Sequence, residues 1–208
     1  MAPRGRPRCF DRTQALQKAM EVFWARGYEG TSMTELTAAM GIASPSLYAA
    51  FGSKQQLFRA ATEHYAQTEG SGTWATFDAH ATAREAIETL LRTTAENVTA
   101  PGKPPGCFTI FAAANCAPEN DEVRRDMTQR RVSVCDHVRL RLEHAIAEGE
   151  LPPGTNARSL TSYFMAVQQG MSIRARDGGS REELLDVAHH AMAVWNGLAR
   201  PAATTTGT

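Results

Sequence analysis

Five side chains between residues 31 and 54 carry groups that can bind phosphate. Hydroxyls, lysine ammonium groups and helix N-termini are the usual partners of the phosphates of a nucleic acid. The chain gathers such groups in one short stretch, at Thr31, Ser32, Ser44, Tyr48 and Lys54. This chemistry predicts a contact with a nucleic-acid backbone.

Base recognition needs other side chains, which project from an exposed helix into a groove. The same stretch offers four candidates, at Thr34, Pro45, Ser46 and Ala49. None of them is a bidentate base reader such as arginine on guanine. Base preference would therefore depend on Thr34, on contacts with thymine methyl groups and on a further contact elsewhere in the chain.

A basic arm supplies that further contact. Residues 1–10, MAPRGRPRCF, contain Gly and Pro without periodicity, and we expect them to be disordered in the free protein. Arg4, Arg6 and Arg8 form a pattern that resembles the AT-hook, whose arginines lie in the minor groove of A·T-rich DNA. The alternative is a solubilising tail. The position of the arm directly before a pair of short helices favours DNA contact.

Two short helices must position these groups. Ser32 followed three residues later by Glu35 predicts a capping box, and Gly41 predicts the end of that helix. Ser44 is expected to cap the next helix, with Pro45 at its first position. Helix, glycine turn and short helix is the helix-turn-helix pattern. The alternative is an ordinary helical hairpin within a core.

The stretch GYEGTSMTELTAAMGIASPSLYAAFGSKQQLF resembles the signature of the TetR family of bacterial transcriptional regulators. The matching positions are Gly27-Tyr28, Thr31-Ser32, Gly41-Ile42, Ser46-Leu47-Tyr48, Phe51 and Ser53-Lys54. The resemblance implies an all-α fold, with an N-terminal three-helix helix-turn-helix DNA-binding domain and a larger α-helical effector-binding and dimerisation domain. It also implies that a fourth helix, from Lys54 to about residue 68, joins the two domains. The chain departs from the family at Pro45 and Ala49. Many members carry a basic residue or glycine at the first position and histidine or tyrosine at the second.

We therefore expect four segments: a disordered arm at 1–10, a DNA-binding domain at 11–66, a ligand-binding and dimerisation domain at 67–200, and a disordered tail at 201–208. Gly70-Ser71-Gly72 is the first strong shift in composition and is expected to break the chain between domains. The last two helices, expected at 156–176 and 180–197, are rich in apolar residues. They either fill the core of one chain or form an interface, and the resemblance implies a homodimer joined by them.

Charge and composition indicate what the protein can bind and where in the cell it lies. Residues 1–60 contain eight Lys and Arg but only four acids, although the whole chain is neutral. A basic head on an acidic body suits a head that contacts phosphate. No signal peptide and no apolar run long enough to span a bilayer are visible. Four cysteines in a chain of this length do not indicate a disulfide framework. The sequence predicts a soluble cytoplasmic protein without a membrane partner.

The candidate effector site consists of apolar and aromatic side chains of the second domain and one amide. They are Trp74, Phe77, Leu91, Phe108, Phe111, Tyr163, Phe164 and Gln168. These types favour a small apolar or aromatic ligand over a sugar phosphate. Each of them can also be an ordinary core residue.

One cysteine is a candidate for sensing. Cys107 follows Gly106 at the expected start of a helix, where the pKa of a thiol falls, so reaction with oxidants or electrophiles is one hypothesis. A small buried hydrophobe is the alternative. Histidine spacing fits no metal site, so neither a metal nor another cofactor is expected. Motifs of hydrolases, P-loop proteins and dinucleotide enzymes are absent from the sequence, which argues against an enzyme.

These observations together predict a homodimeric transcriptional regulator. The expected partners are a palindromic double-stranded DNA operator and a small apolar or aromatic effector that releases the repressor from it. Two alternatives stay open: a regulator that senses thiol-reactive compounds through Cys107, and a sensor that acts through a protein partner.

Overall fold

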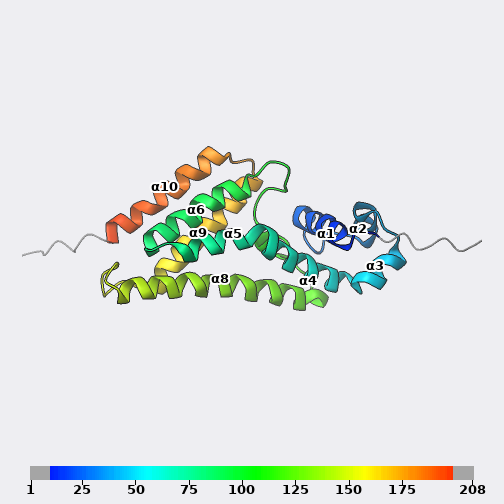
Figure 1. Cartoon of the computed structure of the whole chain (residues 1–208), viewed down its shortest axis with the longest axis horizontal. Coiled ribbons are helices and arrows are strands. Elements are labelled where there is room, and N and C mark those ends of the chain that lie inside the picture. Colours follow the sequence, from blue (N-terminus) through cyan, green and yellow to red (C-terminus); the bar gives the residue numbers. More distant parts are fainter. Residues whose placement is uncertain (1–9, 199–208) are drawn as a thin grey trace, which may run out of the picture.

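A computed structural model describes residues 10–198 of the chain, and none of these residues lies in a β-strand. The described part of the chain forms ten α-helices: α1 Arg12–Arg26, α2 Met33–Met40, α3 Ser44–Phe51, α4 Lys54–Tyr65, α5 Ser71–Ala79, α6 Ala83–Val98, α7 Phe108–Phe111, α8 Asp121–Ala147, α9 Ala157–Arg176 and α10 Arg181–Leu198. A head of α1 to α4 lies at one end of an elongated molecule, and the other helices form the body (Figure 1). The predicted all-α fold is confirmed.

The head is held by apolar side chains that recur at helical spacing. Phe23 of α1, Leu36 of α2, Leu47 of α3 and Leu57 of α4 are all fully buried in one cluster. Asp11 caps α1, since its carboxylate accepts hydrogen bonds from the next turn of backbone. Isolated helices of 8 to 15 residues, as in this head, are at best marginally stable in water, so the shared core stabilises all four.

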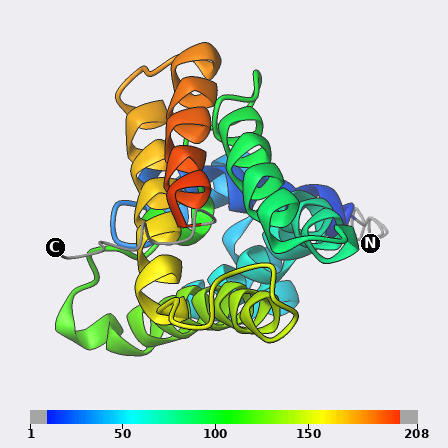
Figure 2. The same cartoon turned by 90° about the vertical axis from the view of Figure 1, so that its left-hand side faces the viewer.

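The body is a bundle built on α6, α8, α9 and α10. Ile87, Leu91, Phe164 and Leu184 are fully buried in a second apolar cluster. Figure 2 shows α9 and α10 side by side along one side of this bundle, with α8 seen end-on below. No helix among residues 10–198 is both long and apolar enough to cross a membrane.

The expected break at Gly70-Ser71-Gly72 was wrong. The chain passes from α4 through a π-helical turn, Ala66–Gly70, directly into α5. The wider turn carries Gly70 without leaving the helix, and the Ser71 hydroxyl donates to the carbonyl of Gln67 at 2.7 Å. The boundary of the domains near residues 66–72 stays a prediction, which falls at this irregular turn.

Candidate nucleic-acid interface

Helix α3 presents a small, exposed face at the end of the head. Ser44, Pro45, Ser46 and Ala49 are exposed, and Tyr48 is 51% exposed, the highest value for an aromatic side chain in the described chain. Leu47 and Phe51 point the other way and are buried. A short helix with small residues on its free face can enter a major groove.

The turn before α3 fixes its direction. Gly41 adopts the left-handed conformation with φ 66°, which residues with a side chain rarely adopt. Ser32 and Glu35 form the predicted capping box at the start of α2, and Thr34 is exposed on its first turn. The prediction that Ser44 caps α3 was wrong by one residue. Ala43 is the N-cap, because its carbonyl accepts from the amides of Ser46 and Leu47. Its side chain makes no capping hydrogen bond.

Two predicted phosphate contacts are engaged inside the head. Thr31 is buried, and its hydroxyl donates to the carbonyl of Gly27 at 2.7 Å. The ammonium group of Lys54 lies 4.4 Å from the centre of the Tyr28 ring, a cation–π contact. Burial lowers the pKa of Lys54, while the nearby Glu29 raises it. Lys54 therefore offers a partly shielded charge to phosphate. The Thr31 hydroxyl, already donating to Gly27, offers phosphate no free donor.

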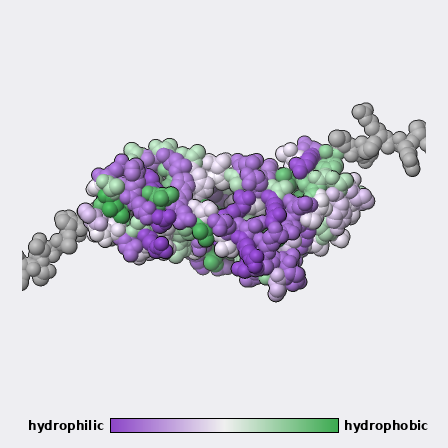
Figure 3. Space-filling view, turned by 90° about the horizontal axis from the view of Figure 1, so that it is seen from below, coloured by the Kyte–Doolittle hydropathy of each residue, from purple (hydrophilic) through white to green (hydrophobic). Residues whose placement is uncertain are grey.

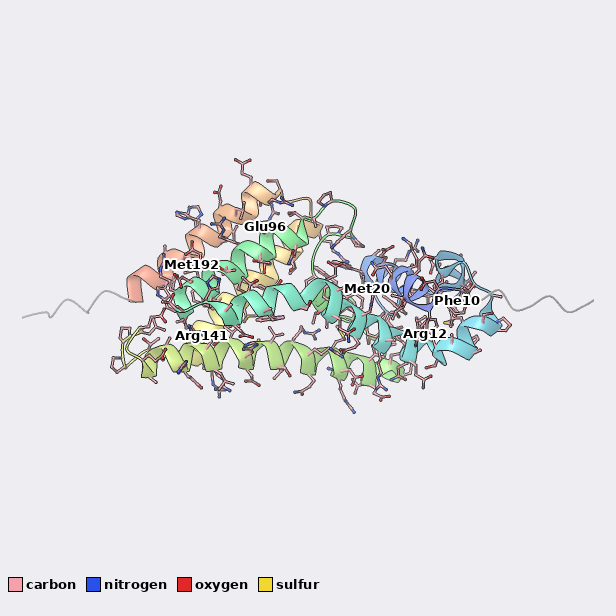
Figure 4. The ribbon with its side chains drawn as sticks, in the orientation of Figure 1. Phe10, Arg12, Met20, Glu96, Arg141 and Met192 are labelled. Atoms are coloured by element: carbon pink, nitrogen blue, oxygen red, sulfur yellow. The ribbon has the colours of Figure 1, made fainter. Side chains whose placement is uncertain are left out.

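The basic arm lies outside the described residues, so Arg4, Arg6 and Arg8 have no assigned position. The residues that follow these arginines, Phe10 and Arg12, are described. The Phe10 ring lies 6.5 Å from the ring of Phe51 in α3, and the Arg12 guanidinium lies over the same ring at 4.7 Å. Figure 4 shows Phe10 and Arg12 at the end of the molecule that carries α3. The chain thus enters the head beside the helix with the exposed face.

Three hydrogen bonds join the head to the segments on either side of α7 and to α9. The Trp24 indole donates to the carbonyl of Gly106 at 3.0 Å, and the guanidinium of Arg176 donates to the carbonyl of Trp24 at 2.6 Å. The amide of Tyr28 donates to the carbonyl of Ala112 at 2.6 Å. The orientation of α1 therefore depends on body residues more than 75 positions away along the chain.

A row of polar pairs holds α4 on α8, and we call it the α4–α8 ladder. Gln55 donates to Glu122 at 2.7 Å, Arg59 donates to Asp126 at 2.8 Å and also pairs with Glu122, and Arg130 donates to Glu63 at 3.2 Å. The partners recur every four residues on both helices, so they share one register. Figure 3, which views the molecule from below relative to Figure 1, shows a largely hydrophilic surface on the side of α8. These residues were not predicted, although polar or charged side chains spaced by four on 55–63 and 122–130 were the available signal.

The eight predicted ligand residues do not surround one cavity. Phe77, Leu91 and Phe164 are fully buried in the body core, and Trp74 packs on them against His137. Phe108 is buried in the head cluster, and Phe111 lies under the guanidinium of Arg176 at 4.0 Å. Tyr163 is 37% exposed and Gln168 is half-buried. A hollow of about 340 Å³ lies elsewhere, between α4 and α8, and is lined by Phe58, Arg59, Val123 and Met127 among others.

The thiols have different surroundings. Cys107 is the N-cap residue of the four-residue helix α7 and is half-buried, and the Tyr65 hydroxyl donates toward its sulfur at 3.5 Å. Burial raises the pKa of Tyr65, and Cys107 adds to the effect, so the phenol keeps the proton that it donates. Burial also raises the pKa of Cys116 and of Cys135, which keeps both as thiols near neutral pH.

Comparison with known proteins identifies the family of the chain. Residues 15–61 match the family described as "Bacterial regulatory proteins, tetR family", and residues 77–195 match the "Tetracyclin repressor-like, C-terminal domain". The chain belongs to the TetR family. Members are bacterial regulatory proteins, and the described helices α1 to α4 coincide with the N-terminal part of the match, residues 15–61.

Relatives extend the match over nearly the whole chain. The HTH-type transcriptional repressor ComR of Escherichia coli K12 is 33% identical over 198 residues, which are 95% of this chain and 94% of ComR. The repressor BdcR of the same organism is 28% identical and covers 88% of each chain. A cysteine mutant of the TetR family regulator CifR, solved in complex with 26-bp operator DNA, is 43% identical. It covers 91% of this chain and 100% of its own, with a TM-score of 0.87. The chain is thus a TetR-family DNA-binding transcriptional regulator.

Proposed function

We propose that this chain is a homodimeric repressor that binds a palindromic operator through α3. The observation that carries the proposal is the free face of α3, from Ser44 to Ala49, held outward by buried Leu47 and Phe51. CifR, 43% identical, is solved with operator DNA, which supports the same use of this head. One short helix reads few bases, so two heads on one palindrome supply the specificity.

The proposed DNA contacts divide by chemistry. The arm residues Arg4, Arg6 and Arg8 approach the minor groove. Phosphate is contacted from Ser32, Ser44, Tyr48 and Lys54, and the bases from Thr34, Pro45, Ser46 and Ala49. The buried hydroxyl of Thr31 supports the turn before α2 instead.

We propose the outer face of α9 and α10 as the dimer interface. Tyr163 and Ile173 of α9 are among the large exposed apolar side chains of the described chain. Ala166 and Gly170 lie between them, and small residues let two helices approach closely. The corresponding helices of a second chain would complete a four-helix bundle (Figure 2).

The effector is proposed to act by moving α4. The α4–α8 ladder and the contacts of Trp24 join the head to the body, so a shift of body helices changes the spacing of the two heads. A small apolar or aromatic molecule that prefers one spacing would release the operator. It can shift the equilibrium only by its difference in affinity for the two states.

Binding to the DNA that flanks the chain's own gene tests the proposed function. We expect one operator fragment to bind two chains, with an affinity that falls steeply with salt, because contacts with phosphates release counterions. Fluorescence anisotropy measures the affinity and analytical ultracentrifugation the stoichiometry. Equal affinity for the flanking fragment and for a shuffled fragment would contradict specific recognition, and would favour a sensor that acts through a protein partner.

A second function, sensing of electrophiles by Cys107, is favoured by one contact. The Tyr65 hydroxyl donates to the Cys107 sulfur at 3.5 Å, and Tyr65 ends α4, the helix that leads to the head. A group added to this sulfur would displace Tyr65 and disturb its stacking on Phe108, whose ring lies 5.1 Å away.

Alkylation gives the corresponding prediction. Iodoacetamide should weaken operator binding of the wild type by about tenfold or more, a change of roughly 1.4 kcal/mol. Cys107→Ser should bind the operator normally and lose this sensitivity. Cys135→Ser is the matched control and should behave as the wild type, because burial raises the pKa of that thiol. Unchanged affinity of the alkylated wild type, with modification of Cys107 verified by mass spectrometry, would exclude this function.

A further inference from the structure

The C-terminal end of α1 is completed by groups of the body and not by its own next turn. Gly27 leaves the helix with φ 73°, and the amide of Tyr28 donates to the carbonyl of Ala112 at 2.6 Å. In a continuing helix, that amide would bind the carbonyl of Trp24, four residues earlier. The Trp24 carbonyl is therefore one of the acceptors that a helix leaves without a backbone partner at its end.

Arg176 supplies the partner of this carbonyl. Nη2 of its guanidinium donates to the Trp24 oxygen at 2.6 Å, and the central carbon of the same group lies 4.0 Å from the centre of the Phe111 ring. The side chain is half-buried, and no carboxylate within residues 10–198 forms an ion pair with it. A cation near the last carbonyls of a helix also interacts favourably with the helix dipole. Carbonyl and ring together therefore hold the guanidinium in one place.

The side chain that completes α1 belongs to α9. Arg176 is the last residue of that helix, and exposed Ile173 of the proposed dimer interface lies less than one turn before it. Within residues 10–198, no other hydrogen bond joins α1 to α4 with α9 or α10. The α4–α8 ladder and the Trp24 indole attach the head to α8 and to the loop before α7 instead. Arg176 thus links the head directly to a helix that we propose to pair with a second chain.

The direction of α1 decides the direction of α3, because the head has one core. Phe23 and Trp24 of α1 lie in the same apolar cluster as Leu47 of α3. Trp24 is only 3% exposed, and its ring meets Tyr65 of α4 edge-on, with 5.0 Å between the ring centres. A contact that fixes the end of α1 therefore also fixes the helix with the exposed face.

We propose that Arg176 is a positioning residue for operator recognition, which holds each head at a fixed angle to α9 and so sets the spacing of the two α3 helices. The inference rests on the proposed function, because it requires two chains on one palindrome. It goes beyond a movement of α4, since the link from α9 to α1 bypasses that helix. Without Arg176 the head takes up more orientations. The apparent affinity for the operator then falls in proportion to the fraction of molecules with the fitting spacing.

Operators with altered spacing test this role. One fragment keeps the natural distance between its half-sites, and a second has two base pairs inserted at its centre, which turns one half-site by about 70° around the DNA axis. The wild type should prefer the natural fragment by about 100-fold or more. Arg176→Met should bind the natural fragment about tenfold more weakly and the lengthened fragment no more weakly than the wild type does. Its preference should therefore fall to about one tenth of the wild-type value, as measured by fluorescence anisotropy.

The control variants separate positioning from stability. Arg174→Met is the matched control, since Arg174 lies in the same turn of α9, is exposed and pairs with Glu183, and it should keep the wild-type preference. Arg176→Lys keeps a donor for the Trp24 carbonyl and should retain more of the preference than Arg176→Met. A purely structural role lowers both affinities equally, so an unchanged preference in Arg176→Met would overturn the inference. If circular dichroism shows that this variant is unfolded, Arg176→Gln, which is polar and too short to reach α1, has the same expected values.

Hydrogen exchange of the free protein tests the contact without DNA. The amide of Tyr28, bonded to the carbonyl of Ala112, should exchange about tenfold faster in Arg176→Met, because the end of α1 opens more often. Arg174→Met should exchange as the wild type does. Unchanged protection of this amide in Arg176→Met would refute the inference whether or not an operator is found. Faster exchange in a chain that binds no operator would contradict the proposed function and leave the link between α9 and α1 intact.

Discussion

Replacing Ser46 by glutamate should reduce specific operator affinity by at least about 100-fold, which is roughly 2.8 kcal/mol. Ser46 is the third residue of α3 and is exposed. It lies in the middle of the face that we propose to enter the major groove. A carboxylate there meets the negative potential of DNA, and like charges at an interface cost several kcal/mol. Fluorescence anisotropy with the flanking fragment measures the loss.

Unfolding cannot account for such a loss. Acidic side chains in the first turn of a helix interact favourably with the positive end of its dipole, so the glutamate should leave α3 at least as stable. Ser46→Ala should bind within a few-fold of the wild type. Ser133→Glu, at an exposed position of α8, adds the same charge to the body and should leave the affinity unchanged. Normal binding of Ser46→Glu would show that another surface meets the operator.

The head could be predicted from the sequence because its signals are local. Ser32 with Glu35, Gly41 and Pro45 each act on the backbone within one turn of helix, and the structure has the helix, turn and helix that they predict. Apolar spacing assigned Leu47 and Phe51 to the inside. Local patterns were less decisive at Ser44 and at Gly70, where one residue of register and one irregular turn changed the outcome.

The joints between head and body could not be predicted, because they pair residues far apart in the chain. Arg59 and Asp126 carry charges that suit many exposed helix faces, and only the packing of α4 on α8 brings them together. The same holds for Arg141 of α8, a residue type common on surfaces, whose guanidinium donates to the carbonyl of Ala81. Aromatic composition likewise did not separate core from cavity, since Phe77 and Phe164 fill the body core.

The order of charges along the α4–α8 ladder has a consequence for the movement of α4. In the observed register Arg59 faces Asp126 and Glu63 faces Arg130. If α4 moved one turn toward the C-terminal end of α8, Arg59 would face Arg130; one turn the other way would place Glu63 against Asp126. Both shifts bring like charges together and therefore disfavour sliding of α4 by a turn, so we expect the proposed effector to tilt α4 instead.

Truncation of Phe58 to alanine should destabilise the chain by about 3–5 kcal/mol, the range for loss of a large buried aromatic side chain. Phe58 of α4 is 2% exposed, and its ring lies 5.1 Å from Phe23, 5.1 Å from Tyr28 and 5.7 Å from Phe108. Those partners come from α1, from the segment after it, and from α7. One cavity would therefore loosen the head and its joint to the body together. Urea unfolding followed by circular dichroism measures the change.

A large share of a typical folding free energy of about 5–15 kcal/mol would then be lost through one side chain. Phe58→Leu preserves most of the volume and should cost less than about 1.5 kcal/mol. Phe111→Ala removes a ring of the same size from a half-buried position, where it contacts Arg176, and should cost clearly less than Phe58→Ala. If Phe58→Ala cost no more than Phe111→Ala, the aromatic cluster would not be the joint, and the α4–α8 ladder with the contacts of Trp24 would have to hold the head on the body.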